Sequence, residues 1–319
     1  MAVYTKLTLE QVAQLLSDCG IARPLAITGI AAGSRHTNYR VEVADKTLFL
    51  RINEGSSPEA LAYERDLVTH LVAAGFPTPS FASPCAVSFG DKPVSLFAFV
   101  RGEPIEPQRL TTENIAEVGR HLARFHVATR DFKNARENPF SAKRVRAMCD
   151  RVEHEGRPDL RVVGKRLHDE VARCADAFEG LAPATIHGDL FHDNILWSGD
   201  KITAILDFEM ASTGAIPYDV AVAILALTFV DRDFRWDQAR ELVGAYSRVN
   251  ALETIERNAL YWISRFAAAR FAVSRITDFE MRPAPEALDR IHKDYRDFLQ
   301  RLDRLDEIGD ALFLERVLE

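Results

Sequence analysis

The sequence predicts an α+β fold with two lobes, a β-rich N-terminal lobe and an α-rich C-terminal lobe. Over about the first hundred of the 319 residues, short runs alternate apolar and polar side chains, which is typical of strands. After Gly102 the apolar residues recur at helical spacing instead. We therefore expect lobes at residues 1–101 and 102–319, with a ligand cleft between them.

The N-terminal lobe is expected to begin with a helix at residues 5–19, capped by Thr8 and ended by Gly20. A second helix is predicted at residues 57–74, because its apolar side chains follow helical spacing and a glycine and a proline come after it. Alternation predicts strands at residues 25–30, 38–43, 47–52, 87–89 and 93–100.

The C-terminal lobe is predicted to be mostly helical. Residues 112–129 place apolar side chains at i, i+3, i+7 and i+10, which form one face of a helix. Residues 143–178 are again mostly helical and highly charged, and helices resume at Tyr218 and continue to the end. Short strands are expected beside Asp189 and Asp207, where they interrupt the helical pattern.

Composition and charge narrow the functional classes. The net charge of −7 leaves no basic surplus to neutralise phosphates, which argues against nucleic acid as a partner. Four scattered cysteines indicate reduced thiols, and neither a disulfide framework nor a zinc site. The N-terminus lacks the apolar segment of a secretory signal, and the most apolar run, residues 220–230, is too short to span a membrane. We expect a soluble cytoplasmic protein without a membrane partner, either a monomer or a homodimer.

The most informative segment combines two carboxylates and an amide. Asp189 follows a His-Gly step, Asn194 comes five residues later, and Asp207 follows an apolar strand. Phosphoryl transfer needs a positioned hydroxyl and a neutralised triphosphate, and these residue types can supply a base and metal ligands. Each residue taken alone would more often have a structural role. In this order they indicate a kinase catalytic loop and its metal-binding partner.

These motifs resemble the aminoglycoside phosphotransferase and choline kinase superfamily of small-molecule kinases, which shares the protein-kinase-like fold. The matching motifs are His187-Gly-Asp189, Asn194, Asp207-Phe-Glu209 and Pro217-Tyr-Asp219. Within the superfamily the chain is most similar to type II homoserine kinases, at residues 1–5, 29–39, 136–139 and 275–278. It departs from their pattern at Gly188 and Glu209, where type II homoserine kinases tend to have alanine and tyrosine.

The resemblance implies a kinase that uses ATP and Mg²⁺, with a nucleotide-binding N-terminal lobe and a catalytic, substrate-binding C-terminal lobe. Asp189 would be the catalytic base, and Asn194 and Asp207 would be the magnesium ligands, because hard oxygen donors suit that ion. Asp219 is expected to order the loop that follows Asp207.

The resemblance also implies where the nucleotide lies. Gly33, Ser34 and Asn38 fall in the loop expected to cover the phosphates, although this loop is glycine-poor and by itself resembles an ordinary hairpin turn. The adenine ring would lie against the inter-lobe segment, residues 96–102. Two phenylalanines in this segment are two residues apart, so they share a face of an extended chain, and we expect that face to be the core.

Arg51 lies on the third predicted strand, where protein kinases carry a phosphate-binding lysine. Glu64 in the following helix fits as its ion-pair partner, and Glu59 is the competing partner. Arginine keeps the positive charge of lysine but presents a planar fork. The structural alternative is a surface arginine on an edge strand.

An acceptor such as homoserine needs a cation for its carboxylate and an acidic group for its ammonium. A late helix offers Arg265, Arg270 and Arg275 for the carboxylate, although their spacing prevents all three from sharing one face. Asp193 or Glu209 could bind the ammonium. His126 is expected to be a core histidine. An aromatic box for a quaternary amine is the less favoured alternative to core packing for Trp236, Tyr261 and Trp262.

The sequence thus predicts an ATP-dependent small-molecule kinase whose leading acceptor is L-homoserine, which gives O-phospho-L-homoserine in threonine biosynthesis. The alternatives are a choline, ethanolamine or aminoglycoside kinase of the same superfamily, and a non-catalytic nucleotide-binding pseudokinase. A protein kinase is disfavoured, because the segment between Asp207 and Asp219 is too short for a peptide-docking activation loop.

Overall fold

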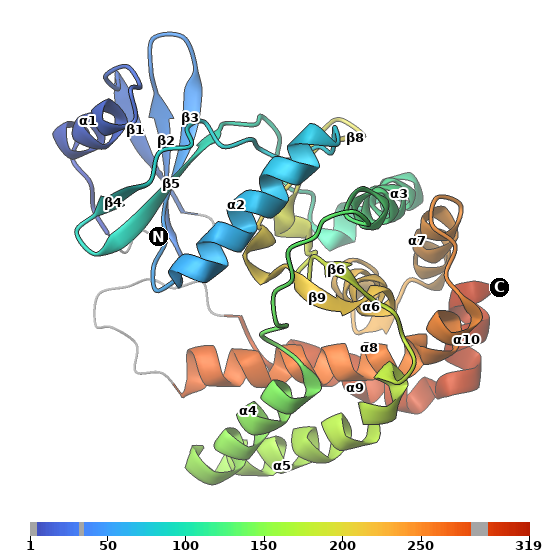
Figure 1. The fold of residues 1–319 in the computed structure, drawn as a ribbon. Coiled ribbons are helices and arrows are strands. Elements are labelled where there is room, and N and C mark those ends of the chain that lie inside the picture. The colour runs from blue at the N-terminus through green and yellow to red at the C-terminus, as the bar shows by residue number, and fades with distance from the viewer. Residues whose placement is uncertain (1–4, 32–34, 282–292) are drawn as a thin grey trace.

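The computed structural model describes residues 5–31, 35–281 and 293–319. Its N-terminal part consists of a β-sheet and two helices, and a much larger helical part follows (Figure 1). The predicted α+β class, with a β-rich first part and an α-rich remainder, is therefore confirmed. The division between residues 101 and 102 stays a prediction.

The N-terminal sheet is antiparallel and its strand order is β1-β2-β3-β5-β4. Its strands are β1 (Ala26–Ile30), β2 (Thr37–Glu42), β3 (Thr47–Ile52), β4 (Val87–Phe89) and β5 (Lys92–Ala98). Helix α1 (Leu9–Asp18) covers one face, and helix α2 (Pro58–Ala73) follows β3 (Figure 1). The boundaries of β3 and β4 are those predicted, because both strands alternate clearly and turn residues flank them.

The alternation of side chains gives the sheet two different faces. Leu50 and Leu96 are buried in one hydrophobic cluster with Val12 and Leu16 of α1. Arg51 and Ser95 are paired across β3 and β5. They point to the opposite face, because neighbouring residues of a strand alternate. The sheet therefore presents an apolar face to α1. The opposite face, called the Arg51 face, carries Arg51 and Ser95 together with Phe49 and Phe97.

The helical part contains a second and larger core. Its helices are α3 (Thr112–Ala128), α4 (Ala142–Glu155), α5 (Pro158–Arg173), α6 (Ile216–Leu227), α7 (Trp236–Ser247), α8 (Thr254–Arg275), α9 (Arg296–Ile308) and α10 (Asp310–Leu318). Nearly every side chain of α6 is buried, which explains why its sequence is apolar all round. Helix α8 crosses this part above α4 and α5 in the view of Figure 1, with α9 and α10 packed beside it.

Three short antiparallel strand pairs lie within the helical part. They are β6 (Pro183–Ile186) with β9 (Ser212–Ala215), β7 (Ile195–Ser198) with β8 (Lys201–Ile205), and β10 (Phe229–Val230) with β11 (Asp233–Phe234). Single helical turns complete it at η1 (Pro107–Arg109), η2 (Ala175–Phe178), η3 (His192–Asn194), η4 (Phe208–Met210) and η5 (Ile276–Glu280). The pairs β6–β9 and β7–β8 hold the segment that contains Asp189, Asn194 and Asp207.

The first predicted helix has a different limit in the structure, and a longer helical region is divided in two. The first begins at Leu9 instead of residue 5, because the Thr8 side chain accepts a hydrogen bond from the Gln11 amide and caps the helix there. Residues 143–178 are mostly helical, as predicted, and the structure divides them into α4, α5 and the turn η2. Pro158 at the start of α5 cannot donate the backbone hydrogen bond that would continue α4.

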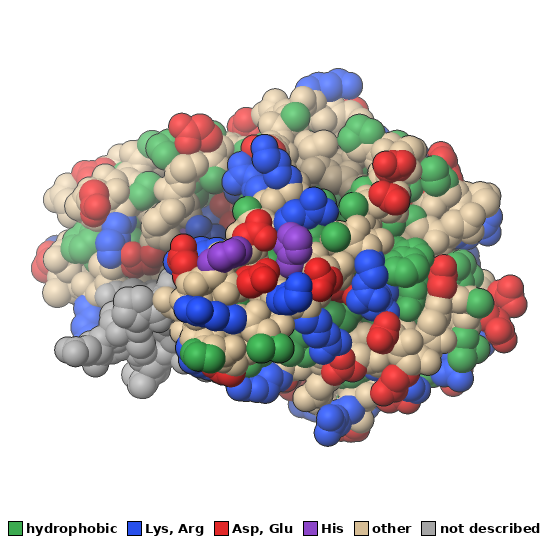
Figure 2. Space-filling view, turned by 90° about the horizontal axis from the view of Figure 1, so that it is seen from below, with side chains coloured by type: hydrophobic (Ala, Val, Ile, Leu, Met, Phe, Trp, Pro, Cys, Tyr) green, Lys and Arg blue, Asp and Glu red, His purple; other side chains and the backbone are tan. Residues whose placement is uncertain are grey.

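The distribution of surface charge and the state of the cysteines agree with the composition of the sequence. Acidic and basic side chains are interspersed on the face seen from below (Figure 2). All four cysteines are free thiols, and Cys149 and Cys174 are buried. Among the helices in the described ranges, none combines the length and the apolar character needed to cross a bilayer.

Candidate active site

The backbone around Asp189 is held by Asp219 at the start of α6. The Asp219 carboxylate accepts hydrogen bonds from the amides of His187 (2.6 Å) and Gly188 (2.8 Å), and it also contacts His126 Nε2 at 3.1 Å. Asp219 was expected to order the loop after Asp207. It orders the residues just before Asp189 instead, because α6 begins beside the end of β6.

His126 is a core histidine, as expected. Its ring contacts Tyr246 and Asp219 and is buried. The aromatic residues considered for an amine box also pack in the core: Trp236 and Tyr261 both contact the Phe313 ring of α10. Trp262 lies against Tyr261, so core packing explains all three.

Asp189 lies at the end of the short turn that follows β6. Its side chain is 29% exposed, and its Oδ1 lies 3.9 Å from Nη1 of Arg270. Burial of this region raises the pKa of Asp189, while the positive charges of Arg270 and Lys293 act in the opposite direction. Asp189 is therefore an accessible carboxylate beside a buried cation.

Asn194 lies beside Asp189, since its Nδ2 donates to the Asp189 carbonyl oxygen at 2.8 Å. The Asn194 carbonyl oxygen in turn accepts from the Leu206 amide at 2.9 Å, directly before Asp207. The three predicted residues are thus joined through a few backbone contacts.

Asp207 has an unusual backbone and an unpaired oxygen. Its φ of 65° is left-handed, a conformation that non-glycine residues seldom adopt. Its Oδ1 is buried without a hydrogen-bond partner in the described part of the chain. Burial and the charge of Glu209 hold the pKa of Asp207 well above its usual range, although Arg51 opposes them. A buried carboxylate oxygen with these properties is suited to a cation.

Arg51 and Glu64 form the predicted ion pair. Both side chains are buried, and Arg51 Nη2 donates to the Glu64 carboxylate. Arg51 Nε also donates to Asn53 Oδ1 at 2.8 Å. Glu59, the competing partner, lies in the exposed first turn of α2. The alternative of a surface arginine on an edge strand is wrong, because β3 lies between β2 and β5.

The predicted phosphate loop is described in part. Asn38 lies on β2 directly opposite Arg51 and is buried. Gly33 and Ser34 lie outside the described residues.

A contact that the sequence did not predict joins the N-terminal sheet to the segment after Asp207. His36 Nε2 lies 2.5 Å from Glu209 Oε2, and Arg35 Nη1 lies 3.6 Å from Glu209 Oε1. Burial would raise the pKa of Glu209, but the His36 hydrogen bond and the charges of Arg35 and Arg51 lower it to about 2. Glu209 is therefore engaged with the N-terminal sheet, which leaves it less suited to binding an ammonium group.

Arg136 is a second residue that the motifs did not identify as part of the site. It donates to the carbonyl oxygens of Glu209 (2.5 Å) and Ala211 (3.1 Å), and so it holds the backbone on both sides of Met210. The only sequence signal was its place in a short segment similar to type II homoserine kinases.

The three candidate arginines of α8 have different surroundings. Arg265 is paired through two nitrogens with Glu170 and through a third with Asp306. Arg275 contacts Asp297 at 3.2 Å. Arg270 alone of the three lies beside Asp189. Asp193 is 45% exposed and lies 3.4 Å from Lys293.

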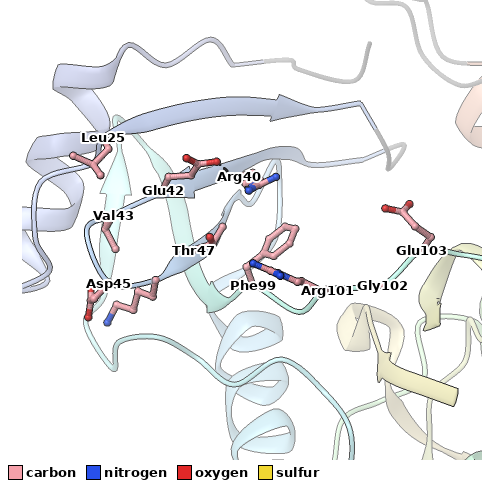
Figure 3. Close-up of a pocket in the computed structure, with 11 residues that line it drawn as sticks. Leu25, Arg40, Glu42, Val43, Asp45, Thr47, Phe99, Arg101, Gly102 and Glu103 are labelled. Carbon is pink, nitrogen blue, oxygen red and sulfur yellow. Dashed lines mark ion pairs between the residues drawn. The ribbon is translucent and has the colours of Figure 1, made fainter. Parts of the chain in front are cut away.

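A cavity of about 760 Å³ lies where the Arg51 face of the sheet meets the segment that leads to the helical part. Residues of β2, β3 and the turn between them line it, together with Phe99, Arg101, Gly102 and Glu103 (Figure 3). The prediction that both phenylalanines share the core is wrong for Phe99. Phe97 stacks on Phe81 within the protein, whereas Phe99 lies beyond the end of β5 and lines the cavity.

The approach of this segment to the helical part requires a glycine. Gly102 lies against the β7–β8 hairpin, and a Cβ at this position would lie 2.5 Å from Thr203 Oγ1 and 3.0 Å from the Trp197 carbonyl oxygen. The adjacent Glu103 amide donates to that same carbonyl at 3.0 Å. Backbone contacts therefore connect the segment that lines the cavity to the β7–β8 hairpin, which directly follows the Asp189 loop.

Comparison with known proteins agrees with this geometry. Residues 26–261 match the phosphotransferase enzyme family. The chain is 30% identical to a homoserine kinase of Nitrobacter hamburgensis, over 97% of this chain and 96% of that protein. It is 34% identical to a homoserine kinase of Rhodopseudomonas palustris, over 89% of each chain. The fold is similar to that of a microcompartment-associated aminopropanol kinase, with a TM-score of 0.68, 16% identity and coverage of 98% and 99%. This chain therefore belongs to the phosphotransferase enzyme family, as a small-molecule kinase with a hydroxyl group as acceptor.

Proposed function

We propose that this enzyme transfers the γ-phosphoryl group of ATP to the side-chain hydroxyl of L-homoserine, giving O-phospho-L-homoserine for threonine biosynthesis. The observation that carries the reaction is the grouping of Asp189, Asn194 and Asp207 around one short turn. The acceptor rests on the relatives that are named homoserine kinase and match nearly the whole chain.

Asp189 is the proposed catalytic base. Its partly exposed carboxylate accepts the proton of the acceptor hydroxyl as the hydroxyl oxygen attacks the γ-phosphorus. The new bond to phosphorus forms as the bond to the β–γ bridging oxygen breaks, and ADP leaves. The raised pKa of Asp189 makes it a better proton acceptor than an ordinary aspartate.

Asn194 and Asp207 are the proposed ligands of Mg²⁺. In the described part of the chain, no three His, Cys, Asp or Glu side chains form a complete metal site. That fits magnesium bound together with a nucleotide, because the ion keeps waters and takes phosphate oxygens as further ligands. When bound, Mg²⁺ neutralises the charge that develops on the phosphates. The unpaired buried Oδ1 of Asp207 fits this role.

The nucleotide is proposed to lie along the Arg51 face of the N-terminal sheet. The cavity beside Phe99 would take the base, and Arg51 would meet the phosphates. Thr47 of the cavity and Arg51 lie on the same face of β3 and four residues apart, which is roughly 13 Å along a strand. An extended nucleotide would therefore connect the cavity with Asp207.

A coupled ADP-release assay over a panel of alcohols tests the proposal. The panel contains homoserine, threonine, choline, ethanolamine, aminopropanol and aminoglycosides. We expect kcat/KM for homoserine to be at least about tenfold above that for any other acceptor, which corresponds to about 1.4 kcal/mol of discrimination. A different preferred acceptor would replace homoserine, and activity on none would support a pseudokinase.

The Asp189→Asn variant tests the role of the base. Turnover should fall by about a thousandfold or more, while ATP binding measured by calorimetry stays near wild type. Asp200→Asn is the matched control, because Asp200 is exposed in the turn between β7 and β8. Turnover of Asp189→Asn within a few fold of the control would exclude Asp189 as the base.

A further inference from the structure

Arg270 is a buried cation whose hydrogen-bonding capacity is largely unused. It lies on α8 with 3% of its surface exposed, and its Nε is buried without a partner in the described residues. Burying a charge without close pairing costs free energy, so such groups are retained where a ligand completes them. Within the described ranges the carboxylate found near it is that of Asp189, at 3.9 Å, which is too long for a hydrogen bond.

Two aromatic rings fix the plane of the Arg270 guanidinium. Its central carbon lies 3.5 Å from the centre of the Phe140 ring and 3.8 Å from that of the Phe271 ring. Cation–π contacts of this kind cover the faces of the guanidinium and leave its N–H groups pointing outward from the edge. The edge of a fixed guanidinium is the shape that binds a carboxylate through two parallel hydrogen bonds.

The other arginines of α8 show that this arrangement is specific to Arg270. Arg265 satisfies its guanidinium with Glu170 and Asp306, and Arg275 contacts Asp297 and the Asp294 carbonyl oxygen. Neither has a carboxylate partner in the Asp189 loop. Arg270 is therefore the arginine of this helix that is close to the reaction centre and still able to bind an anion.

We infer that Arg270 binds the carboxylate of the acceptor and thereby selects short hydroxy acids and hydroxy amino acids. This inference rests on the proposed function, because it uses Asp189 as the place of the acceptor hydroxyl. The short distance between Arg270 and Asp189 requires the hydroxyl and the carboxylate to be separated by only a few carbon atoms. Amino alcohols and aminoglycosides lack the anion that Arg270 would bind.

Three related acceptors show which part of recognition depends on the carboxylate and which part on the ammonium. Homoserine has a hydroxyl, an ammonium and a carboxylate. The aminopropanol used here, 3-amino-1-propanol, lacks only the carboxylate, and γ-hydroxybutyrate lacks only the ammonium. In Arg270→Gln, the ratio of kcat/KM for homoserine to that for aminopropanol should fall about a hundredfold, mainly through the KM for homoserine. Arg270→Lys should recover part of the ratio, because it restores the charge but not the planar fork.

Arg275→Gln is the matched control, since it removes an arginine of the same helix that does not contact Asp189. Thermal unfolding and ATP binding of each variant establish that it is folded. An unchanged acceptor ratio, with both alcohols slowed equally, would overturn the inference and show that Arg270 acts on Asp189 or on the transferred phosphoryl group.

Binding of γ-hydroxybutyrate, measured by calorimetry with ADP and Mg²⁺ present, tests the carboxylate contact without turnover. Wild-type protein should bind it, and Arg270→Gln should bind it at least about tenfold more weakly. Equal binding by both proteins, or none by wild type, would overturn the inference. Failure of wild type to phosphorylate homoserine, with this binding difference intact, would contradict the proposed acceptor and not the role of Arg270.

Discussion

His36 and Glu209 are 173 positions apart in the chain and share a hydrogen bond of 2.5 Å. The Nδ1 atom of His36 accepts from the Glu54 amide at 3.0 Å, so the proton lies on Nε2 and is donated to the Glu209 carboxylate. The bond ties the loop before β2, which is expected to cover the phosphates, to the residues that follow Asp207. A substitution of either residue should therefore alter the contribution of the other to stability.

A double-mutant cycle with His36→Gln and Glu209→Gln measures this coupling. We expect the two losses of unfolding free energy, read from urea titrations, to be non-additive by about 1–2 kcal/mol, because each variant breaks the same charged hydrogen bond. Additivity within about 0.4 kcal/mol would show that the contact contributes nothing in solution.

The Arg51–Glu64 pair should determine nucleotide affinity. In Glu64→Gln the Arg51 guanidinium loses its buried partner, so we expect the KM for ATP to rise about tenfold while the KM for the acceptor changes little. Glu59→Gln changes a glutamate of the same helix that is exposed, and it should leave both constants near wild type. Equal effects of the two variants would contradict the assigned pair.

Alanine substitutions at two glycines with left-handed backbones distinguish the cost of backbone strain from the cost of steric crowding. Gly199 has a φ of 58°, and nothing lies within 4 Å of an added Cβ. Gly188 has a φ of 77°, and an added Cβ would lie 3.1 Å from the Met210 carbonyl oxygen. We expect Gly199→Ala to lower the unfolding free energy by about 1 kcal/mol, from backbone strain alone.

Gly188→Ala should cost more than Gly199→Ala, by roughly a further 1 kcal/mol, and should also reduce kcat because Asp189 follows directly. Chemical denaturation and steady-state kinetics give the two readings. A Gly188→Ala variant as stable and active as Gly199→Ala would mean that the loop relaxes without disturbing Asp189.

Two buried histidines should each contribute to destabilisation of the protein in mild acid. Burial lowers the pKa of both His121 and His187. The unfolded chain therefore takes up protons as pH falls below about 6.5, whereas the folded chain does so at lower pH. The contribution of the two histidines to the unfolding free energy should decrease between about pH 7.5 and 5.5, by at most about 1.4 kcal/mol per pH unit for each histidine.

His121→Asn should make this pH dependence shallower, because one of the two groups is removed. His154→Asn is the control, since the His154 ring is exposed on α4. A His121→Asn protein with the same slope as the control would show that His121 does not take part in the acid destabilisation.

Local patterns account for most of the secondary structure that was predicted correctly. The strand Thr47–Ile52 alternates clearly, and the helix from Thr112 has strong helical periodicity and a clear capping residue. Both were therefore predicted from the sequence. The two-residue strands β10 and β11 were missed, because a strand of that length has no period to detect. The break between α4 and α5 depends on a single proline within a highly helical composition.

The same distinction applies to the site. Asp189, Asn194 and Asp207 are close in sequence, and Arg51 and Glu64 lie on neighbouring elements, so their order and spacing predicted that they would meet. The sequence by itself determined the reaction class, and local spacing together with the resemblance predicted these five positions. Tertiary structure decided that His36 meets Glu209, that Asp219 holds the turn before Asp189, and which of three α8 arginines reaches that turn. These contacts join segments about 30 to 170 residues apart, and packing of the helical part sets their geometry.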